Sequence, residues 1–226
     1  IKFTFNYHEC TKCKTIFVNP RPLDLYFRKF YKEGKSVKYW SDVFYKKTAK
    51  NRKEKLWKNK AKKLLKLINS KTTEIIDIGG GYGIFAEVMR NFSDNPITII
   101  EPNNHLATIC RNKKFNVIEK YIEDIAKKDL SKNNKFFVSF ELFEHLHNPS
   151  KFLKQMFSLM KNSDKFCFTT LSGQGFDIQM LKENSNSIFP PHHLNFLNPN
   201  SIEILAKRVG FNKVYVETPG LLDVDI

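Results

Sequence analysis

The clearest apolar pattern in the first third of the chain lies between residues 46 and 69. Within this lysine-rich stretch, apolar side chains recur every three or four positions, which is the spacing of one face of an α-helix. The lysines fall on the opposite face and meet water. The pattern predicts an amphipathic helix that covers a sheet with Trp57, Ala61, Leu64, Leu65 and Ile68.

From residue 74 onwards, short apolar runs alternate with helical patterns. The runs with strand character span residues 74–78, 97–101, 116–119, 136–140, 165–170 and 213–217. Such alternation is typical of a mostly parallel sheet with helices on both faces. The sequence therefore predicts an α/β fold, a Rossmann-like three-layer αβα sandwich, in which ligands bind beyond the carboxyl ends of the strands.

A separate N-terminal extension is expected over residues 1–45, before a main domain over residues 46–226. The first 20 residues indicate a small extended or β element that ends in Asn19-Pro-Arg-Pro. The remainder is rich in aromatic side chains, which we expect to pack short helices onto the main domain. Two of them, Tyr39 and Trp40, are also candidate substrate contacts, because aromatic rings can stack against a ligand.

Cys10 and Cys13 have the spacing at which two thiolates form half of a tetrahedral zinc site. His8 could add a nitrogen, but a structural zinc site needs four ligands. The pair is therefore either half of a zinc ribbon whose other half lies upstream, or a remnant without metal. No complete zinc site is expected here. Cys110 and Cys167 fall in a predicted helix and a predicted strand, as buried thiols do.

The formal net charge of +15 raises the question of a nucleic-acid or membrane partner. The chain has 32 lysines but 6 arginines, alongside 21 asparagines and 21 phenylalanines, which is the bias of an AT-rich gene. Specific phosphate and base contacts favour arginine, so we interpret the lysines as a solvated surface and expect no nucleic-acid partner. Without a signal sequence or a long apolar run, the protein is expected to be soluble and cytoplasmic, with no membrane contact.

Residues 74–89, EIIDIGGGYGIFAEVM, place three alternate glycines between a predicted strand and a predicted helix. A P-loop would need a lysine followed by serine or threonine after its last glycine, and this chain continues with Ile84. A dinucleotide-binding fingerprint needs glycine at its sixth position, which is again Ile84. The remaining interpretation is a loop for a ligand other than a pyrophosphate. It combines an acid at the end of the strand with main chain that carries no side chains, and its residues are Asp77, Gly79, Gly81 and Gly83.

Further candidate site residues follow the other strands. The second strand ends in Glu101, before Pro102, where a carboxylate can accept hydrogen bonds from both hydroxyls of a ribose. After the third strand, Ile122 and Glu123 could pack on and hydrogen-bond an adenine, although an acid at a helix N-terminus explains Glu123 nearly as well. The fourth strand leads to two more candidates beside the glycines, Phe140 and Glu141.

Together these motifs resemble class I S-adenosylmethionine-dependent methyltransferases. The resemblance rests on DIGGGYG, the strand-end Glu101, FELFEHLHNP and HHLNFLNPNSIEILAKRVGF, and it covers nearly the whole chain from Tyr7. The similar subgroup carries a cysteine ribbon before an NPRP motif and often modifies sugars or other small metabolites. The resemblance implies a seven-stranded sheet with an antiparallel last strand. This chain departs from it at Lys135, where an acid usually opens the fourth strand, and in its early end, TPGLLDVDI.

The resemblance also implies how the cofactor is held. S-adenosylmethionine has no phosphate, so the glycines would let the backbone approach its methionine and ribose portions. Asp77 would hold the loop or, through water, the ammonium group. Glu101 would bind the ribose, and Glu123 or its neighbouring backbone the adenine amino group. Since the sulfonium already makes the methyl group reactive, the protein mainly has to align the acceptor and manage its proton.

Three histidines are candidates for the catalytic base that takes this proton. His145 follows the fourth strand, where packing at a helix end explains it equally well. His192 and His193 follow a polar stretch within residues 171–199, an insertion long enough for a lid over the acceptor. Related sugar methyltransferases resemble this segment in placing a basic histidine before an aromatic-rich run, which corresponds best to His193 and next to His192. A purely structural role, fixing the loop, is the alternative.

The sequence therefore predicts an S-adenosylmethionine-dependent methyltransferase acting on oxygen or carbon of a small, sugar-like or nucleotide-sugar acceptor. Two alternatives stay open. One is an RNA methyltransferase that uses the lysine surface, and its RNA binding would depend steeply on salt. The other is a non-catalytic scaffold that binds S-adenosylmethionine. The sequence does not fix the oligomeric state.

Overall fold

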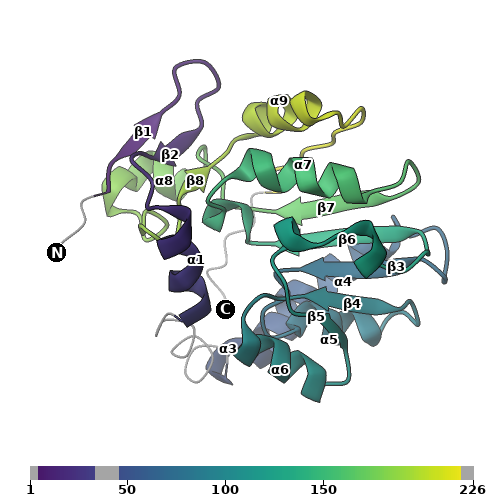
Figure 1. The fold of residues 1–226 in the computed structure, drawn as a ribbon. Coiled ribbons are helices and arrows are strands. Elements are labelled where there is room, and N and C mark those ends of the chain that lie inside the picture. Colours follow the sequence, from purple (N-terminus) through teal and green to yellow (C-terminus); the bar gives the residue numbers. More distant parts are fainter. Residues whose placement is uncertain (1–4, 34–45, 220–226) are drawn as a thin grey trace. The chain divides into compact units, whose positions relative to one another are not determined.

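The computed structural model describes residues 5–33 and 46–219 (Figure 1). These residues fall into two compact units. The sheet unit comprises residues 28–33, 46–139 and 159–167, and the histidine unit comprises residues 5–27, 140–158 and 168–219. Among these described residues, no helix combines the length and the apolar character needed to cross a lipid bilayer.

The sheet unit is built on a parallel sheet with the strand order β5-β4-β3-β6-β7 (Figure 1). The central strand β3 pairs in parallel with both β4 and β6. All five residues of β3 are buried, as expected for a strand covered on both faces. The strands are β3 (Glu74–Ile78), β4 (Ile97–Ile100), β5 (Asn116–Ile118), β6 (Lys135–Phe140) and β7 (Lys165–Thr169), and the last residues of β6 and β7 belong to the histidine unit.

The predicted amphipathic helix is confirmed in part, because it is not a regular α-helix throughout and ends at Leu65 instead of residue 69, with Leu65 and Ile68 only partly buried. It consists of α3 (Lys46–Asn51), the π-helical turn η2 (Arg52–Trp57) and α4 (Lys58–Leu65). Trp57, Ala61 and Leu64 are buried as predicted, and the Trp57 ring packs on Phe85 with 5.9 Å between ring centroids. The remaining helical elements of the unit are α5 (Ile84–Arg90), α6 (Asn104–Asn112), and the short 3₁₀ turns η3 (Ile122–Asp124) and η4 (Lys127–Asp129).

The histidine unit contains a small antiparallel sheet with the order β1-β2-β8. Phe143 lies at the centre of its aromatic packing, stacked on Phe168 with 4.0 Å between centroids and edge-on to Phe152 at 5.1 Å. The elements are β1 (Tyr7–Glu9), β2 (Ile16–Val18), β8 (Asn195–Phe196), α7 (Pro149–Leu159), α8 (Phe176–Leu181), α9 (Pro199–Val209), and the 3₁₀ turns η5 (Phe143–His145) and η6 (Lys182–Asn184). Helix α1 (Asp24–Glu33) has residues in both units.

Helix α9 begins with a reciprocal cap between Asn198 and Ser201. The Asn198 side chain accepts the N–H of Ser201 at 2.9 Å, and the Ser201 hydroxyl accepts the N–H of Asn198 at 2.8 Å. This reciprocal cap satisfies two N–H groups that lack a helical partner. The helix ends at Gly210, whose φ of +121° favours glycine.

Five of the six predicted strands are confirmed, with ends that differ by at most one residue. The sixth, over residues 213–217, is wrong, because these residues have no regular structure and Tyr215 is 88% exposed. Apolar alternation alone does not make a strand when no neighbouring strand pairs with its backbone. Within the described residues the parallel sheet therefore has five strands, not the seven that the resemblance implied.

Candidate functional site

The glycine loop, residues 79–83, leads from β3 into α5. The N–H of Gly79 donates to the carbonyl of Ile100 at the end of β4, at 2.8 Å, which fixes the loop on the strand ends. A left-handed backbone costs a residue with a side chain roughly 1–2 kcal/mol, so this path requires glycine where φ is positive. The angles are +68° at Gly79, +53° at Gly81 and +67° at Gly83.

Gly80, which was not among the predicted site residues, is more crowded than Gly81 and Gly83. A Cβ atom there would lie 2.6 Å from Cγ2 of Ile99 and 3.0 Å from Oδ2 of Asp77. At Gly81, in contrast, a Cβ atom would meet no atom within 4 Å. One side of the loop therefore packs tightly on the sheet, while the backbone of Gly81 remains open to approach.

Glu101, the strand-end acid, lies against the glycine loop. Its Oε2 accepts the N–H of Gly81 at 3.0 Å, and its Oε1 accepts the N–H of Asn103 at 2.9 Å. The side chain is buried, with 6% of its residue surface exposed. The structure thus brings together two groups that lie 20 residues apart in sequence.

Asp77 and Glu101 form a buried pair of acids beneath the loop. Burial, with a smaller contribution from the charge of Glu101, raises the pKa of Asp77 to about 7. Burial also raises the pKa of Glu101 to about 7, although the N–H groups of Asn103 and Gly81 oppose this rise. Oδ2 of Asp77 is buried and has no hydrogen-bond partner among the described residues. Because buried polar atoms usually have a partner, this oxygen is available to accept a hydrogen bond from a donor.

Helix α6 supports the glycine loop through contacts that the sequence did not reveal. The Cys110 thiol donates to the carbonyl of Gly81 at 3.2 Å, and Nζ of Lys113 donates to the carbonyl of Tyr82 at 2.6 Å. Burial raises the pKa of Cys110 to about 12, so the thiol keeps the proton that it donates. Lys113 is also 3.2 Å from Glu87. No sequence motif predicts such contacts, because each joins a side chain to a main-chain oxygen that is distant in the sequence.

Asn103 is a further residue beside the glycine loop that was not predicted from the sequence. It follows Pro102 and caps α6, with its Oδ1 accepting the N–H of Leu106 at 3.1 Å. Its Nδ2 donates to the carbonyl of Lys32 at 3.1 Å. Asparagine at a helix N-cap is a recognisable signal, but its second role, donating its own N–H to Glu101, is visible only in the structure.

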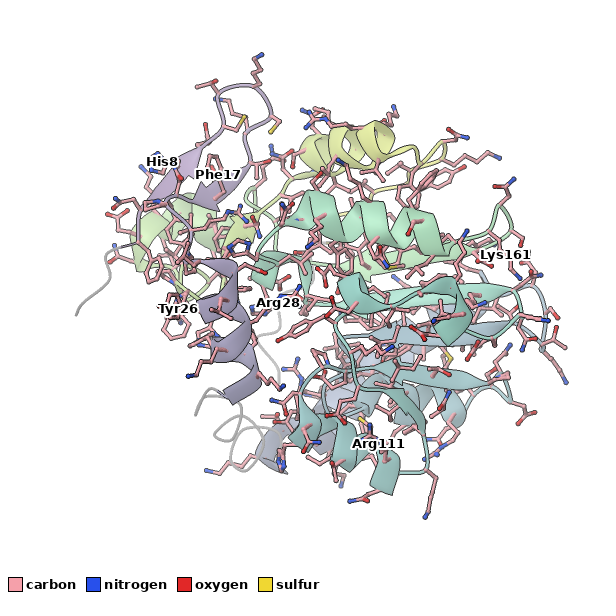
Figure 2. The ribbon with its side chains drawn as sticks, viewed as in Figure 1. His8, Phe17, Tyr26, Arg28, Arg111 and Lys161 are labelled. Carbon is pink, nitrogen blue, oxygen red and sulfur yellow. The ribbon has the colours of Figure 1, made fainter. Side chains whose placement is uncertain are left out.

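The residues predicted to contact adenine lie in η3. Ile122 is buried, whereas Glu123 is partly exposed. The neighbouring Asp124 pairs with Arg28 at 3.2 Å, and the Arg28 guanidinium, labelled in Figure 2, lies 4.6 Å from the centre of the Tyr121 ring. The structure therefore offers an apolar side chain and an accessible carboxylate at this position.

Phe140 and Glu141, at the end of β6, belong to the histidine unit. Glu141 has a φ of +49°, a left-handed conformation that is costly for this residue type. Its Oε1 accepts the hydroxyl of Thr169 at 2.6 Å, while Oε2 of the buried Glu144 accepts the hydroxyl of Thr170 at 2.8 Å. Burial, followed by the charge of Glu141, raises the pKa of Glu144 to about 8.

His145, His192 and His193 form the histidine cluster. The ring centroids of His145 and His193 are 4.8 Å apart. Nδ1 of His145 donates to the carbonyl of His192 at 2.8 Å, and Nδ1 of His193 donates to the carbonyl of Ser187 at 2.7 Å. The His192 ring stacks on Phe189 with 5.1 Å between centroids.

These contacts define which nitrogen could accept a proton. A carbonyl oxygen only accepts, so Nδ1 of His145 and of His193 carries the proton and Nε2 carries the lone pair of the neutral ring. Burial lowers the pKa of His193. Burial and the neighbouring His193 lower the pKa of His145 to about 3, which leaves it a much weaker base. Burial and His193 also lower the pKa of His192.

Cys10 and Cys13 lie on the turn between β1 and β2, both partly exposed. Hydrogen bonds from the N–H groups of Cys13 and Lys12 lower the pKa of the Cys10 thiol. The ring of His8 lies 6.1 Å from that of Phe17, both labelled in Figure 2, and its Nε2 is 3.2 Å from the carbonyl of Asn19. In the part of the chain that the structure describes, no group of three or more His, Cys, Asp or Glu residues is placed to hold a metal. The substrate candidates Tyr39 and Trp40 lie outside the described residues.

A profile of the methyltransferase domain family matches residues 40–216. The match covers well over half of the chain, so the chain belongs to this family. The prediction of an S-adenosylmethionine-dependent methyltransferase with a Rossmann-like fold is thereby confirmed at the level of the family. No curated protein sequence matches the chain.

Solved structures share the fold. An S-adenosylmethionine-dependent methyltransferase of Thermotoga maritima, described as a possible histamine N-methyltransferase, aligns with 87% of this chain and 88% of its own at 16% identity and a TM-score of 0.59. A second S-adenosylmethionine-dependent methyltransferase, from Archaeoglobus fulgidus, aligns over 75% of each chain at 20% identity and a TM-score of 0.59. Human N-acetylserotonin methyltransferase, solved with S-adenosylmethionine, covers 88% of this chain and 56% of its own at 13% identity and 0.62. Identities this low show the fold and leave the acceptor open.

Proposed function

We propose that this methyltransferase transfers the methyl group of S-adenosylmethionine to an oxygen or carbon of a small, sugar-like acceptor such as a nucleotide sugar. The observation that carries the cofactor site is the buried Glu101 carboxylate, held against the N–H of Gly81 at 3.0 Å. A carboxylate fixed in this way accepts hydrogen bonds from the two hydroxyls of a ribose.

The acids beneath the loop suit the charge of this cofactor. When bound, S-adenosylmethionine supplies a methyl group on a positively charged sulfur, and it also carries an ammonium group. Oδ2 of Asp77, which has no partner among the described residues, would accept from that ammonium directly or through water. Positive charge nearby favours the ionised forms of Asp77 and Glu101, whose pKa values burial has raised. The open backbone of Gly81 would lie along the ligand, with Ile122 and Glu123 at the adenine.

His193 would take the proton that the acceptor loses. Its Nδ1 hydrogen bond to Ser187 leaves the lone pair on Nε2, and its lowered pKa keeps the ring neutral at pH 7. His192 is the second candidate, whereas the pKa of about 3 makes His145 the weakest. The surrounding segment also exposes aromatic rings that could stack on a sugar, since Phe176 is 73% exposed and Phe189 57%.

Calorimetry tests the cofactor site. Glu101→Gln keeps the size of the side chain but removes its charge, so we expect S-adenosylhomocysteine to bind roughly 100-fold more weakly, the loss of one or two hydrogen bonds to a charged group. Glu119→Gln is the matched control, because this exposed acid follows β5 and pairs with Arg111 at 2.8 Å. Equal affinity for wild type and Glu101→Gln would refute the assigned site.

An acceptor screen tests the chemistry. Nucleotide sugars, free sugars, small phenols, amines and RNA are each incubated with radiolabelled S-adenosylmethionine. We expect transfer to a sugar-containing compound. Transfer to RNA, with binding that weakens steeply in salt, would replace the sugar proposal. Tight cofactor binding without transfer to any acceptor would indicate a scaffold.

A further inference from the structure

Positive charge is distributed unevenly between the two units. The described residues of the sheet unit include 26 lysines and arginines and 12 aspartates and glutamates, a net charge of +14. Those of the histidine unit include 9 basic and 8 acidic residues, a net charge of +1. One gene encodes both units, so a bias in its composition does not by itself explain the difference. Such asymmetry is typical of a surface that binds a polyanion.

Much of this charge lies on the helix that covers the sheet. Residues 46–66 contain ten lysines and one arginine but a single acid, Glu54. The apolar face of the helix is buried, with Trp57, Ala61 and Leu64, so the other side of the helix faces water. Seven lysines are exposed on that side, and we name them the lysine face: Lys47, Lys50, Lys55, Lys58, Lys62, Lys63 and Lys66.

Other lysines of this helix have contacts within the sheet unit. Nζ of Lys53 is 2.7 Å from Oε2 of Glu87, and Nζ of Lys60 is 5.0 Å from the centre of the Trp57 ring. Most of the lysine face differs from them. The lysines that form no ion pair with another described residue are Lys47, Lys50, Lys58, Lys62, Lys63 and Lys66.

Three of these lysines lie in one row along the helix. Lys58, Lys62 and Lys66 follow one another at intervals of four residues, and side chains four residues apart are neighbours on a helix surface. Like charges at this spacing destabilise a helix. Because an anionic surface would offset this repulsion, the row favours a negatively charged partner.

Exposed apolar side chains lie beside the C-terminal end of the row. Nζ of Lys62 is 5.7 Å from the centre of the Phe92 ring, which is 38% exposed, and Leu67, which follows Lys66, is 45% exposed. Nζ of the exposed Lys165 donates to the carbonyl of Leu67 at 2.8 Å, which adds a further lysine at this end. Lysines around exposed apolar side chains suit the boundary between lipid headgroups and acyl chains.

We propose that the lysine face binds the surface of a membrane that contains anionic lipids. A cluster of about four to eight basic residues on a helix is typical of such binding, because a charged surface attracts each lysine without requiring a fixed geometry. RNA is a polyanion too, but proteins bind it with arginine and with exposed aromatic rings that stack on bases. Within residues 46–66 the one aromatic residue, Trp57, is buried, and the one arginine is Arg52.

This attachment is electrostatic and reversible, because the apolar face of the helix remains buried against the sheet. It replaces the interpretation of these lysines as a solvated surface. It also goes beyond the proposed methyl transfer, since the lysine face contains no residue of the glycine loop or the histidine cluster.

Vesicle sedimentation of the purified full chain tests the proposal. We expect binding to vesicles of phosphatidylcholine with phosphatidylserine, no binding to vesicles of phosphatidylcholine alone, and release as salt rises, since salt screens the charges. Failure to bind the anionic vesicles at low salt would overturn the proposal. Oligouridine that binds more tightly and displaces the vesicles would overturn it in favour of a nucleic-acid partner.

A triple variant removes the row of lysines. Lys58→Gln/Lys62→Gln/Lys66→Gln should weaken binding to the anionic vesicles roughly 100-fold. Lys58→Arg/Lys62→Arg/Lys66→Arg keeps the charges and should bind as the wild type does. Circular dichroism checks that both variants are folded. Wild-type binding by the glutamine variant would show that this row is not the contact surface.

A matched control places the same loss of charge elsewhere in the sheet unit. Lys127→Gln/Lys128→Gln/Lys132→Gln removes three exposed lysines between β5 and β6 and should weaken vesicle binding only a few-fold. Equal losses in the control and in the lysine-face variant would contradict the assignment, because net charge alone would then explain binding. Neither cofactor affinity nor methyl transfer is measured, so these outcomes do not depend on the proposed function.

Discussion

The glycine loop and the histidine cluster, the two regions predicted to contain the site residues, are held by different kinds of contact. The loop is shaped by main-chain hydrogen bonds and by the absence of side chains, as the crowding at Gly80 shows. The cluster is held by side chains, since His145 and His193 each donate from Nδ1 to a carbonyl within residues 187–192. A binding loop made of main chain suits a ligand of fixed shape. A surface segment held by side chains can vary in sequence, and this suits acceptors of different shapes.

Burial acts on both regions in opposite directions. It raises the pKa values of Asp77 and Glu101 and lowers those of His145 and His193. In both regions the neutral form is favoured, because a low dielectric disfavours charge. At pH 7 the two acids are therefore only partly ionised, and a positively charged ligand would favour their ionised forms. The histidines, in contrast, are already in the form that accepts a proton.

The largest expected effect is on turnover. His193→Ala should lower kcat on the acceptor by roughly 100-fold to 10,000-fold, the usual contribution of a general base, while the affinity for S-adenosylhomocysteine stays unchanged. His105→Ala, on the exposed side of α6, is the control. Wild-type turnover by His193→Ala would place the base elsewhere, with His192 tested next.

The next largest effect is on the stability of the glycine loop. Gly80→Ala should lower the free energy of unfolding by about 1–3 kcal/mol, because its Cβ atom would overlap Ile99. Gly81→Ala should cost less, about 1–2 kcal/mol from its left-handed backbone alone. Urea unfolding measures both. If Gly81→Ala proved the more damaging of the two, the crowding at Gly80 would not be what shapes the loop.

The pH dependence of stability and of cofactor affinity tests the pKa values of the two buried acids. Because their folded pKa values of about 7 exceed the ordinary values near 4, Asp77 and Glu101 make the ligand-free protein less stable as pH rises from about 4 to about 7. Cofactor affinity should change in the opposite sense, rising about tenfold between about pH 5.5 and pH 7.5 as the pair ionises. Calorimetry across this range should show a flatter profile for Glu101→Gln. A wild-type affinity that falls with rising pH would contradict these assignments.

The smallest expected effect is a loss of cofactor affinity when a contact between α6 and the glycine loop is removed. Cys110→Ala removes the hydrogen bond to the Gly81 carbonyl and part of a buried contact, so cofactor affinity should fall a few-fold, or about 1 kcal/mol. Cys110→Ser, which retains a hydrogen-bond donor, should bind the cofactor more tightly than Cys110→Ala. Identical affinity for both variants would show that the thiol only fills space.

How far the sequence predicted these regions depends on the range of the interactions. The ends of the strands and the position of Glu101 were predicted, because both follow from the pattern of apolar and polar residues within a few positions of each other. The contacts of Cys110 and Lys113 with the loop carbonyls join distant residues through the main chain, and no spacing in the sequence indicates them. Lys135, at which the chain departs from the resemblance, makes a similar contact, because the residue is buried and its Nζ donates to the carbonyls of Ser131 and Asn133 at 2.7 and 2.8 Å.

The histidine unit was predicted less completely for the same reason. The three histidines were found by residue type and by resemblance, but their proton positions depend on the carbonyls of His192 and Ser187. The strand expected at residues 213–217 shows the limit of pattern reasoning, since pairing with a neighbour, which the sequence does not display, decides whether such a stretch becomes a strand.

A crystal structure of the protein with S-adenosylhomocysteine would test the central claim most directly. We predict that the ribose hydroxyls lie within hydrogen-bonding distance of the Glu101 carboxylate, with the homocysteine portion along the main chain of Gly81. A nucleoside bound elsewhere in the protein, or a ribose that makes no contact with Glu101, would contradict the account.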